Sequence, residues 1–302
     1  MGTTLKKKTR SFQGILEEMT LLKRKVRSLT KEIESIRTVS LEDASSVEKM
    51  LKMRRIQILR RNPTDRLFFP SDFLPFHKTR FYEMMKKYSF RLVLRDMVKH
   101  QDQFRIEDLT HYCSVKVVQG YCDQLIEMGS IIQNEKGQYR TLISPIYSFG
   151  PTLEWFIAEL FKREFASPAI YGVHVKKTPS GGDYDVIAAW NQRLVYVEVK
   201  SSPPKGIEFT EVSTFLSRIE DLQPEVAFLF NDTQLRMKDK LVVMLEEELE
   251  RRYGRESRTA FPVERLIGEL FHVHHRIFIV NSKKDIMENF HVCLKHYLKY
   301  GT

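Results

Sequence analysis

Acidic and basic side chains recur at strand spacing in the C-terminal half of the sequence. Glu198 and Lys200 flank Val199 in one apolar run, and Asp185 directly precedes another. Because side chains alternate between the two faces of a strand, Glu198 and Lys200 share a face. Asn191-Gln192 forms a short turn between the runs, so Asp185 should approach Glu198 across a hairpin. Neighbouring carboxylates repel unless a proton or cation intervenes, and this pair predicts a magnesium site.

The motif resembles that of the PD-(D/E)XK, or restriction-endonuclease-like, nuclease superfamily. Asp185 is followed by 12 residues and then by Glu198-Val199-Lys200, within a helix-strand-strand-strand-helix-strand order. The resemblance covers residues 149 to about 231 and is nearest to Holliday-junction resolvases and Mrr-type restriction enzymes. Tyr184 stands where the proline of the family's name is expected, a position that varies among members.

The resemblance implies roles for the residues that match the family's motif. Magnesium, which manganese can replace, would be held by Asp185, Glu198 and the backbone carbonyl of Val199. Lys200 would orient the attacking water or help to deprotonate it. The family's helix glutamate matches Glu154, with Glu159 as the less favoured candidate. Such a site polarises the phosphoryl group and acidifies metal-bound water. Members of the family often require a partner ATPase, which this sequence, lacking a GxxxxGK[ST] loop, does not itself supply.

Other interpretations of the same residues stay open. Glu198 and Lys200 can pair on a surface hairpin, an interaction worth roughly 0–1 kcal/mol. Asp183 can be an outer acid of the site or, more simply, part of the Gly181-Gly182-Asp183 turn. The protein can also be a DNA-binding regulator or scaffold that does not cleave. The motif reads phosphate and not bases, so an RNA-directed nuclease is a further alternative.

Residues 149–302 should form an α/β nuclease domain, a mixed sheet covered by helices. One group of residues near its end has no assigned role. His272, His274 and His275 form HVHH before an apolar strand, but strand edges often carry such residues, and we expect no metal there. The expected helices are 152–165, 210–222, 233–251, 263–271 and a closing one; the expected strands are 169–176, 184–190, 193–200, VAFLF and RIFIV.

Residues 88–148 have the order of a winged helix-turn-helix module: three helices and a hairpin turning at Lys136-Gly137. By analogy with that family, the helix 115–128 would enter the major groove of DNA. Acidic residues in the same elements would repel phosphates, so a protein-contact or dimerisation role is the alternative. The expected nucleic-acid contacts are Lys116, Gln119, Lys136 and Arg140.

The N-terminal segment, residues 1–62, is predicted to be a basic coiled-coil arm. It holds 16 Lys and Arg against 7 Asp and Glu, whereas the remainder holds 33 against 32. A basic arm suits a polyanion such as DNA. Its apolar residues recur at heptad spacing, which predicts either the seam of a homodimeric coiled coil or a bent pair of helices. The segment that follows, residues 63–87, is predicted to be an aromatic-rich connector. The apolar positions are Ile15, Met19, Leu22, Val26, Leu29, Ile33 and Ile36, and a second helix should carry Val47, Met50, Leu51 and Ile58.

Composition sets the broad class of the protein. With 302 residues and 42% hydrophobic content, the chain is long enough for about two domains with a sizeable core. Three widely spaced cysteines indicate neither a disulfide framework nor a zinc site. The sequence contains no run of 18 apolar residues. We therefore expect a soluble, cytoplasmic protein without a membrane partner.

Overall fold

The computed structural model describes residues 22–29, 46–143, 146–176 and 178–301. The chain divides into two compact units, Met1–Ser46 and Val47–Thr302. In the first unit residues 22–29 are helical, with Leu22 and Leu29 exposed. Val26, between them, is exposed as well. The remaining positions of the predicted heptad stripe, Ile15, Met19, Ile33 and Ile36, lie outside the described residues, so the coiled coil and the dimer stay predictions.

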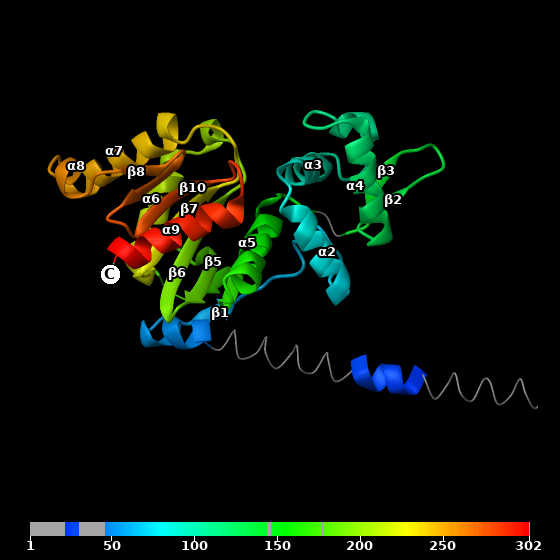
Figure 1. The fold of residues 1–302 in the computed structure, drawn as a ribbon, viewed down its shortest axis with the longest axis horizontal. Coiled ribbons are helices and arrows are strands. Elements are labelled where there is room, and N and C mark those ends of the chain that lie inside the picture. Colours follow the sequence, from blue (N-terminus) through cyan, green and yellow to red (C-terminus); the bar gives the residue numbers. More distant parts are fainter. Residues whose placement is uncertain (1–21, 30–45, 144–145, 177, 302) are drawn as a thin grey trace, which may run out of the picture. The chain divides into compact units, whose positions relative to one another are not determined.

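A mixed eight-stranded sheet forms the centre of the second unit (Figure 1). Its order is β1-β4-β5-β6-β7-β10-β9-β8. The pairs β6–β7 and β7–β10 are parallel, and all other pairs are antiparallel. The strands are β1 (Ile58–Arg60), β4 (Ala169–Val175), β5 (Asp183–Trp190), β6 (Arg193–Lys200), β7 (Val226–Asn231), β8 (Glu264–Ile267), β9 (Leu270–Val273) and β10 (Ile277–Asn281).

Helices cover both faces of this sheet, because β6 and β7 carry apolar side chains on both sides. On one face α5 (Gly150–Glu164) and α9 (Ile286–Tyr300) pack against residues such as Val197 and Phe228. On the other face lie α6 (Phe209–Leu222), α7 (Val243–Tyr253), which follows the single-turn segment η3 (Lys238–Val242), and helix 46–53. The short elements η2 (Pro204–Gly206) and α8 (Ser257–Ala260) complete this domain. The predicted α/β class is confirmed. No described helix is long and apolar enough to cross a bilayer.

A smaller helical part precedes α5. It consists of α2 (Pro75–Met85), α3 (Tyr88–Lys99), η1 (Ile106–Leu109), α4 (Val115–Glu127) and the hairpin β2 (Ile131–Gln133)–β3 (Tyr139–Thr141). The order of α3, η1, α4 and the hairpin is the predicted one, and its assignment as a winged helix-turn-helix stays a proposal. The connector packs aromatic rings on α5, where Phe69 lies 5.0 Å from Trp155 between ring centroids.

A buried ion pair ties α3 to the end of β7. Arg91 donates from Nε to both carboxylate oxygens of Asp232 at 3.0 Å, and the two side chains are 1% and 0% exposed. Arg95 and Ser282 also donate to this carboxylate. The N–H of Asp232 donates to the carbonyl of Lys200 at 2.8 Å. The helical part is thus joined to the strand that carries Glu198 and Lys200.

Three sequence predictions differ from the fold. Ile58 belongs to β1, which pairs with β4, and not to a helix. Residues 263–271, predicted as a helix, form strand β8 and the start of β9, joined through Gly268 at φ 56°. The first unit ends at Ser46, so residues 47–62 belong with the sheet. They hold much of the basic excess: residues 46–62 have six Lys and Arg against one acid, and residues 1–45 have ten against six.

Candidate active site

The hairpin β5–β6 places Asp185 beside Glu198, as predicted. Val186 pairs with Val197 and Trp190 with Arg193, so Asp185 stands opposite Glu198 at the next position. The turn residues Asn191 and Gln192 both have positive φ, the backbone that suits a two-residue hairpin. The Asp185 carboxylate accepts a hydrogen bond of 2.7 Å from the N–H of Val199.

Glu198 is the most enclosed acid of the group, with 2% of its side chain exposed. Lys200 Nζ lies 3.0 Å from one carboxylate oxygen and Arg218 Nη1 2.7 Å from the other. The Tyr196 hydroxyl also donates to it. Burial raises the pKa of Glu198, but the charges of Lys200 and Arg218 more than offset it, so the pKa is lowered. Glu198 is therefore held as a carboxylate.

Glu154 is the helix glutamate that reaches this cluster. A Cβ placed on Gly172 would lie 3.7 Å from Glu154 Oε2, and Gly172 is the β4 residue opposite Asp185. Glu159, the alternative, instead pairs with Lys162 and Arg163 of its own helix at 3.1 and 2.9 Å. The structure thus places Glu154 near Asp185.

Gly172 makes this approach geometrically feasible. Its φ is 53°, and a Cβ there would lie 2.7 Å from Cδ of Pro63. The residues on either side of it, Tyr171 and Val173, belong to the apolar clusters on opposite faces of the sheet. In a regular strand residues two apart share a face, so the strand changes face at Gly172.

We expect Gly172→Ala to lower the free energy of unfolding by about 1–3 kcal/mol, because alanine is strained at positive φ and meets Pro63. Urea denaturation of the purified protein measures this. The matched control is Gly120→Ala in α4, where a Cβ meets nothing within 4 Å. That change should raise stability by about 0.5–1 kcal/mol, the difference in helix propensity. Equal or greater stability of Gly172→Ala would contradict the assigned strain.

The three carboxyl groups lack enough positive charge for all to be ionised. Burial and then the charge of Glu198 raise the pKa of Asp185 to about 7. Burial and then Asp185 and Glu198 raise the pKa of Glu154 well above its usual value. Arg218 Nη1 is 4.0 Å from Asp185 and already engaged with Glu198. A divalent cation would supply the missing charge.

The donor atoms here suit a hard cation. The carboxylates provide oxygen ligands, and the Val199 carbonyl can add another. Its N–H faces Asp185, and the N–H and C=O of one strand residue point to the same side. Oxygen donors with two or three carboxylates match magnesium better than soft metals. Asp185, Glu198 and the Val199 carbonyl therefore fit the predicted ligand set, with Glu154 beside them.

Helix α6 contributes residues that the sequence reasoning missed. Arg218 contacts Glu198, and Glu211 Oε1 lies 2.8 Å from Lys200 Nζ. Although burial lowers the pKa of Lys200, Glu198 and Glu211 raise it overall. Lys200 thus stays an ammonium. The alternation of side chains along a strand does not reveal which residues of a neighbouring helix face that strand. The sequence offered one signal for these two residues: Glu211 and Arg218 are seven residues apart, about two helical turns, and so share one face of a helix.

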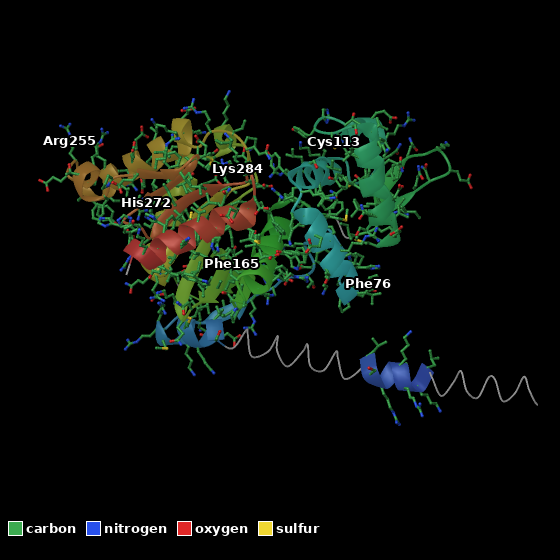
Figure 2. The ribbon with its side chains drawn as sticks, in the orientation of Figure 1. Phe76, Cys113, Phe165, Arg255, His272 and Lys284 are labelled. Carbon is green, nitrogen blue, oxygen red and sulfur yellow. The ribbon has the colours of Figure 1, made fainter. Side chains whose placement is uncertain are left out.

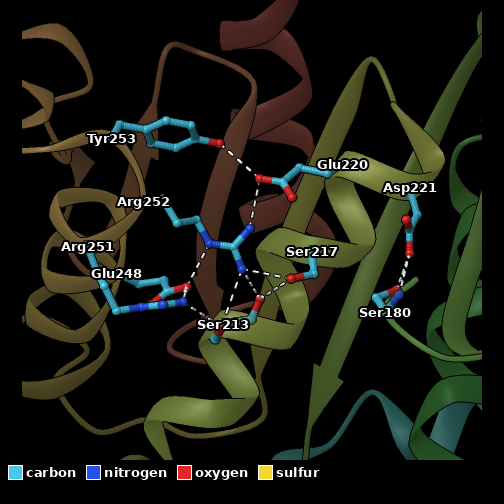
Figure 3. Close-up of polar contacts among 9 residues, drawn as sticks. All are labelled: Ser180, Ser213, Ser217, Glu220, Asp221, Glu248, Arg251, Arg252 and Tyr253. Atoms are coloured by element: carbon cyan, nitrogen blue, oxygen red, sulfur yellow. Dashed lines mark hydrogen bonds and ion pairs between the residues drawn. The ribbon is translucent and has the colours of Figure 1, made fainter. Parts of the chain in front are cut away.

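Polar contacts fix α6 in place (Figure 3). Arg252 of α7 donates to the Ser213 carbonyl at 2.7 Å and pairs with Glu220 at 2.8 Å. Fully buried Glu248 accepts from Arg252 at 2.7 Å. At the other side of α6, Asp221 accepts from the Ser180 N–H at 3.0 Å. The loop ahead of β5 and the helix carrying Arg218 are thus held together.

The predicted nucleic-acid residues lie apart from this cluster, on α4 and the hairpin β2–β3. Lys116, Lys136 and Arg140 are exposed. Gln119 is half-buried, and its amide donates to Asp123 at 2.8 Å and to the Tyr139 hydroxyl at 3.3 Å. Its amide is therefore engaged within the module. Asp183 is exposed and is the first residue of β5, where its carboxylate lies 2.9 Å from Nδ1 of His174, its partner on β4. It thus follows the glycine turn, and its role as an outer acid of the site stays a prediction.

Comparison with known proteins gives a limited picture. No protein-family model matches the sequence, and no curated protein sequence is similar to it. Among solved structures, the chain is similar to protein VC1899 from Vibrio cholerae, with TM-score 0.46 and 12% identity over 78% of this chain. It is also similar to Can2 from Sulfobacillus thermosulfidooxidans, solved with cyclic tetra-adenylate, with TM-score 0.43 and 12% identity over 84% of this chain. This chain spans 59% and 60% of those proteins.

Proposed function

We propose that the protein is a magnesium-dependent nuclease of the PD-(D/E)XK type that hydrolyses phosphodiester bonds in DNA. The observation that carries this proposal is the convergence of Glu154, Asp185 and Glu198 beside the ammonium of Lys200. An ion pair on a surface hairpin does not explain it, because Glu198 is buried and Asp185 has too few cationic partners.

The residues have separable roles in this proposal. Asp185, Glu198 and the Val199 carbonyl would hold magnesium, and Glu154 would complete the shell or hold a coordinating water. When bound, the metal neutralises charge on the phosphoryl oxygens and makes water more acidic. The ammonium group of Lys200, held between Glu198 and Glu211, orients the attacking water. Arg218 keeps Glu198 ionised and in position.

The substrate should be bound mainly through phosphates. Exposed lysines and arginines lie on helix 46–53 and strand β1, and Arg60 pairs in register with His174, close to the start of β5. The region 1–45 adds basic charge, and a homodimer through it would present two active sites. A partner ATPase remains part of the proposal, because nucleases of this kind often need one.

Cleavage assays test the proposal directly. Linear, branched and single-stranded DNA and RNA are incubated with the purified protein in Mg²⁺, Mn²⁺ or EDTA. We expect metal-dependent cleavage of at least one DNA substrate and none in EDTA. Preferential cleavage of RNA would move the function to the RNA-directed alternative. The absence of cleavage of every substrate would contradict the nuclease assignment.

A non-cleaving DNA-binding protein is the second candidate, and one observation favours it. Two cations, Lys200 and Arg218, already contact the two oxygens of Glu198. If they neutralise the site without metal, DNA would bind equally well in Mg²⁺ and EDTA and would stay intact.

The helical module has an alternative role of its own. Val115 and Val117 at the start of α4 are exposed, which favours a contact with a protein for this module.

The salt dependence of DNA binding should identify the surface that meets phosphates. Each lost phosphate contact lowers the slope of log affinity against log salt by about 0.9 on duplex DNA. We expect a lower slope when exposed side chains of the segment 46–62 are changed and binding is titrated at several salt concentrations. An unchanged slope would exclude this segment. Two triple variants are compared. One carries Lys49→Ala, Lys52→Ala and Arg60→Ala in the segment 46–62, and the other carries Lys116→Ala, Lys136→Ala and Arg140→Ala in the helical module.

A further inference from the structure

Three histidines from β9, from the turn after it and from α9 lie close together near the C-terminal end of α9; Figure 2 labels His272. His272 lies on β9, His275 in the turn between β9 and β10, and His296 on α9. One ring nitrogen of each lies within 4.8 Å of the others. The ring centroids are 4.6 to 5.0 Å apart, with His272 4.7 Å from His275. The sequence analysis expected no metal here, because strand edges often carry such histidines; it did not include His296, which is remote from the HVHH run in the sequence.

Packing alone leaves part of this cluster unexplained. His275 Nδ1 and His296 Nε2 share a hydrogen bond of 2.9 Å. His272 is 4% exposed, and its Nδ1 is buried without a hydrogen-bond partner among the described residues. A buried polar atom without a partner is costly, and native structures rarely keep one without a reason. Histidine nitrogens are the commonest protein ligands of transition metals.

The ligand chemistry points to zinc. Three imidazoles suit a four-coordinate zinc ion whose fourth position is left to water, with zinc–nitrogen distances of about 2.0–2.1 Å. Glu264 Oε2 lies 3.8 Å from His272 Nε2 and not beside the unpartnered Nδ1, so the three histidines alone form the proposed ligand group. The neighbouring His274 is turned away, with Nε2 2.7 Å from the carbonyl of Ala260. The three histidines thus differ from a generic cluster of surface histidines.

This cluster is distant from the carboxylates in the sheet's topology. β10 runs parallel to β7 and β6, and the turn that holds His275 precedes β10. Glu198 and Lys200 lie at the other end, where β6 finishes. A metal at the histidines would therefore not act in catalysis. It would join the last turn of α9 to the β9–β10 hairpin, beside the contact of Arg276 Nε with the Gly301 carbonyl at 3.0 Å.

We propose that His272, His275 and His296 form a zinc site, with the fourth position left to water, that fixes α9 onto the edge of the sheet. The site does not depend on the proposed nuclease activity. Binding of zinc to the folded state but not to the unfolded chain raises the melting temperature by mass action.

The test measures zinc in the full-length protein carrying Glu198→Gln, with excess Mg²⁺, so that the carboxylate cluster does not supply the signal. After dialysis against Zn²⁺, elemental analysis should find one zinc per chain. Co²⁺ in its place should show the intense visible absorption of tetrahedral coordination. Zinc at 100 times its dissociation constant should raise the melting temperature by about 5–10 °C.

Matched variants separate a ligand from a packed side chain. His275 and His274 both have positive φ, which asparagine tolerates, so His275→Asn and His274→Asn are compared. Zinc binding should weaken in His275→Asn and in His296→Gln by more than the about 10- to 100-fold loss that an outer hydrogen-bond partner causes. It should persist in His274→Asn. Zinc bound equally by His275→Asn and the unmodified site, or no zinc bound at all, would overturn the proposal.

Discussion

Substitution of Glu198 by glutamine should abolish magnesium-dependent cleavage. The amide keeps the size of the side chain but loses the charge that binds a divalent ion and pairs with Lys200 and Arg218. Loss of one strong electrostatic contact of this kind costs about 10²–10³ in rate, and loss of the metal itself costs more. We therefore expect a fall in the cleavage rate of at least about 10³-fold, measured with saturating Mg²⁺ on the substrate that the wild type cuts best.

Two glutamates of α5 provide a matched comparison. Glu154→Gln should lower the rate strongly, because Glu154 lies near Gly172 and Asp185. Glu159→Gln, one turn further along the same helix, removes only ion pairs with Lys162 and Arg163 and should leave the rate near that of the wild type. Equal cleavage by Glu198→Gln and the wild type would show that the site is assigned wrongly.

The pH dependence of the free energy of unfolding shows whether a loss of cleavage in a variant of Asp185 reflects misfolding. The pKa of Asp185 is about 7 in the folded protein and near 3.9 in an unfolded chain. Between these values the folded state binds more protons than the unfolded state, so stability falls as the pH rises from about 4 to 7. Asp185→Asn removes that fall, and in metal-free buffer at pH 7 its melting temperature should equal or exceed that of the wild type. A lower melting temperature would indicate a structural role for the charge.

The strands around the site could be predicted from the sequence because strand periodicity and turn residues are local signals. β6 spans the predicted 193–200, and the Asn191-Gln192 turn sets its register against β5. Register then determines that Asp185 stands opposite Glu198. The helix glutamate was predicted to be Glu154 from the resemblance, with Glu159 less favoured. Sequence alone could not exclude Glu159, because the choice depends on how α5 rotates against β4.

Features created by packing could not be predicted in the same way. Arg218 reaches Glu198 only after α6 has docked on the sheet, and His296 joins His272 only after α9 has done so. Residues 263–271 carry apolar side chains at intervals that also fit a helix, so the hairpin depends on positive φ at Gly268. Residues 47–62 were assigned to the arm because charge patterning does not show that Val47 and Leu51 are buried.

Replacement of Asp232 by alanine should cause the largest loss of stability. Asp232 is fully buried and neutralises Arg91, which is 1% exposed, so the substitution leaves a buried guanidinium without its counter-charge. Removal of one partner of such a pair costs about 3–5 kcal/mol. With about 2–4 °C per kcal/mol for a domain of this size, the melting temperature should fall by about 6–20 °C.

A second variant separates the charge from the packing. Exchange of both partners, Arg91→Met with Asp232→Leu, removes the buried charges together and should recover much of the stability, since apolar replacements of buried pairs are often neutral. Arg95 also contacts Asp232 and is 14% exposed, so it can hydrate in the double variant. Urea denaturation of the single and double variants gives the coupling energy between the two residues. The backbone N–H of Asp232 donates to the carbonyl of Lys200 at 2.8 Å. A backbone shift at residue 232 in Asp232→Ala should therefore also displace Lys200 and slow any cleavage. Stability equal to the wild type in Asp232→Ala would mean that water reaches Arg91, and the ion pair would then not be what joins α3 to the sheet.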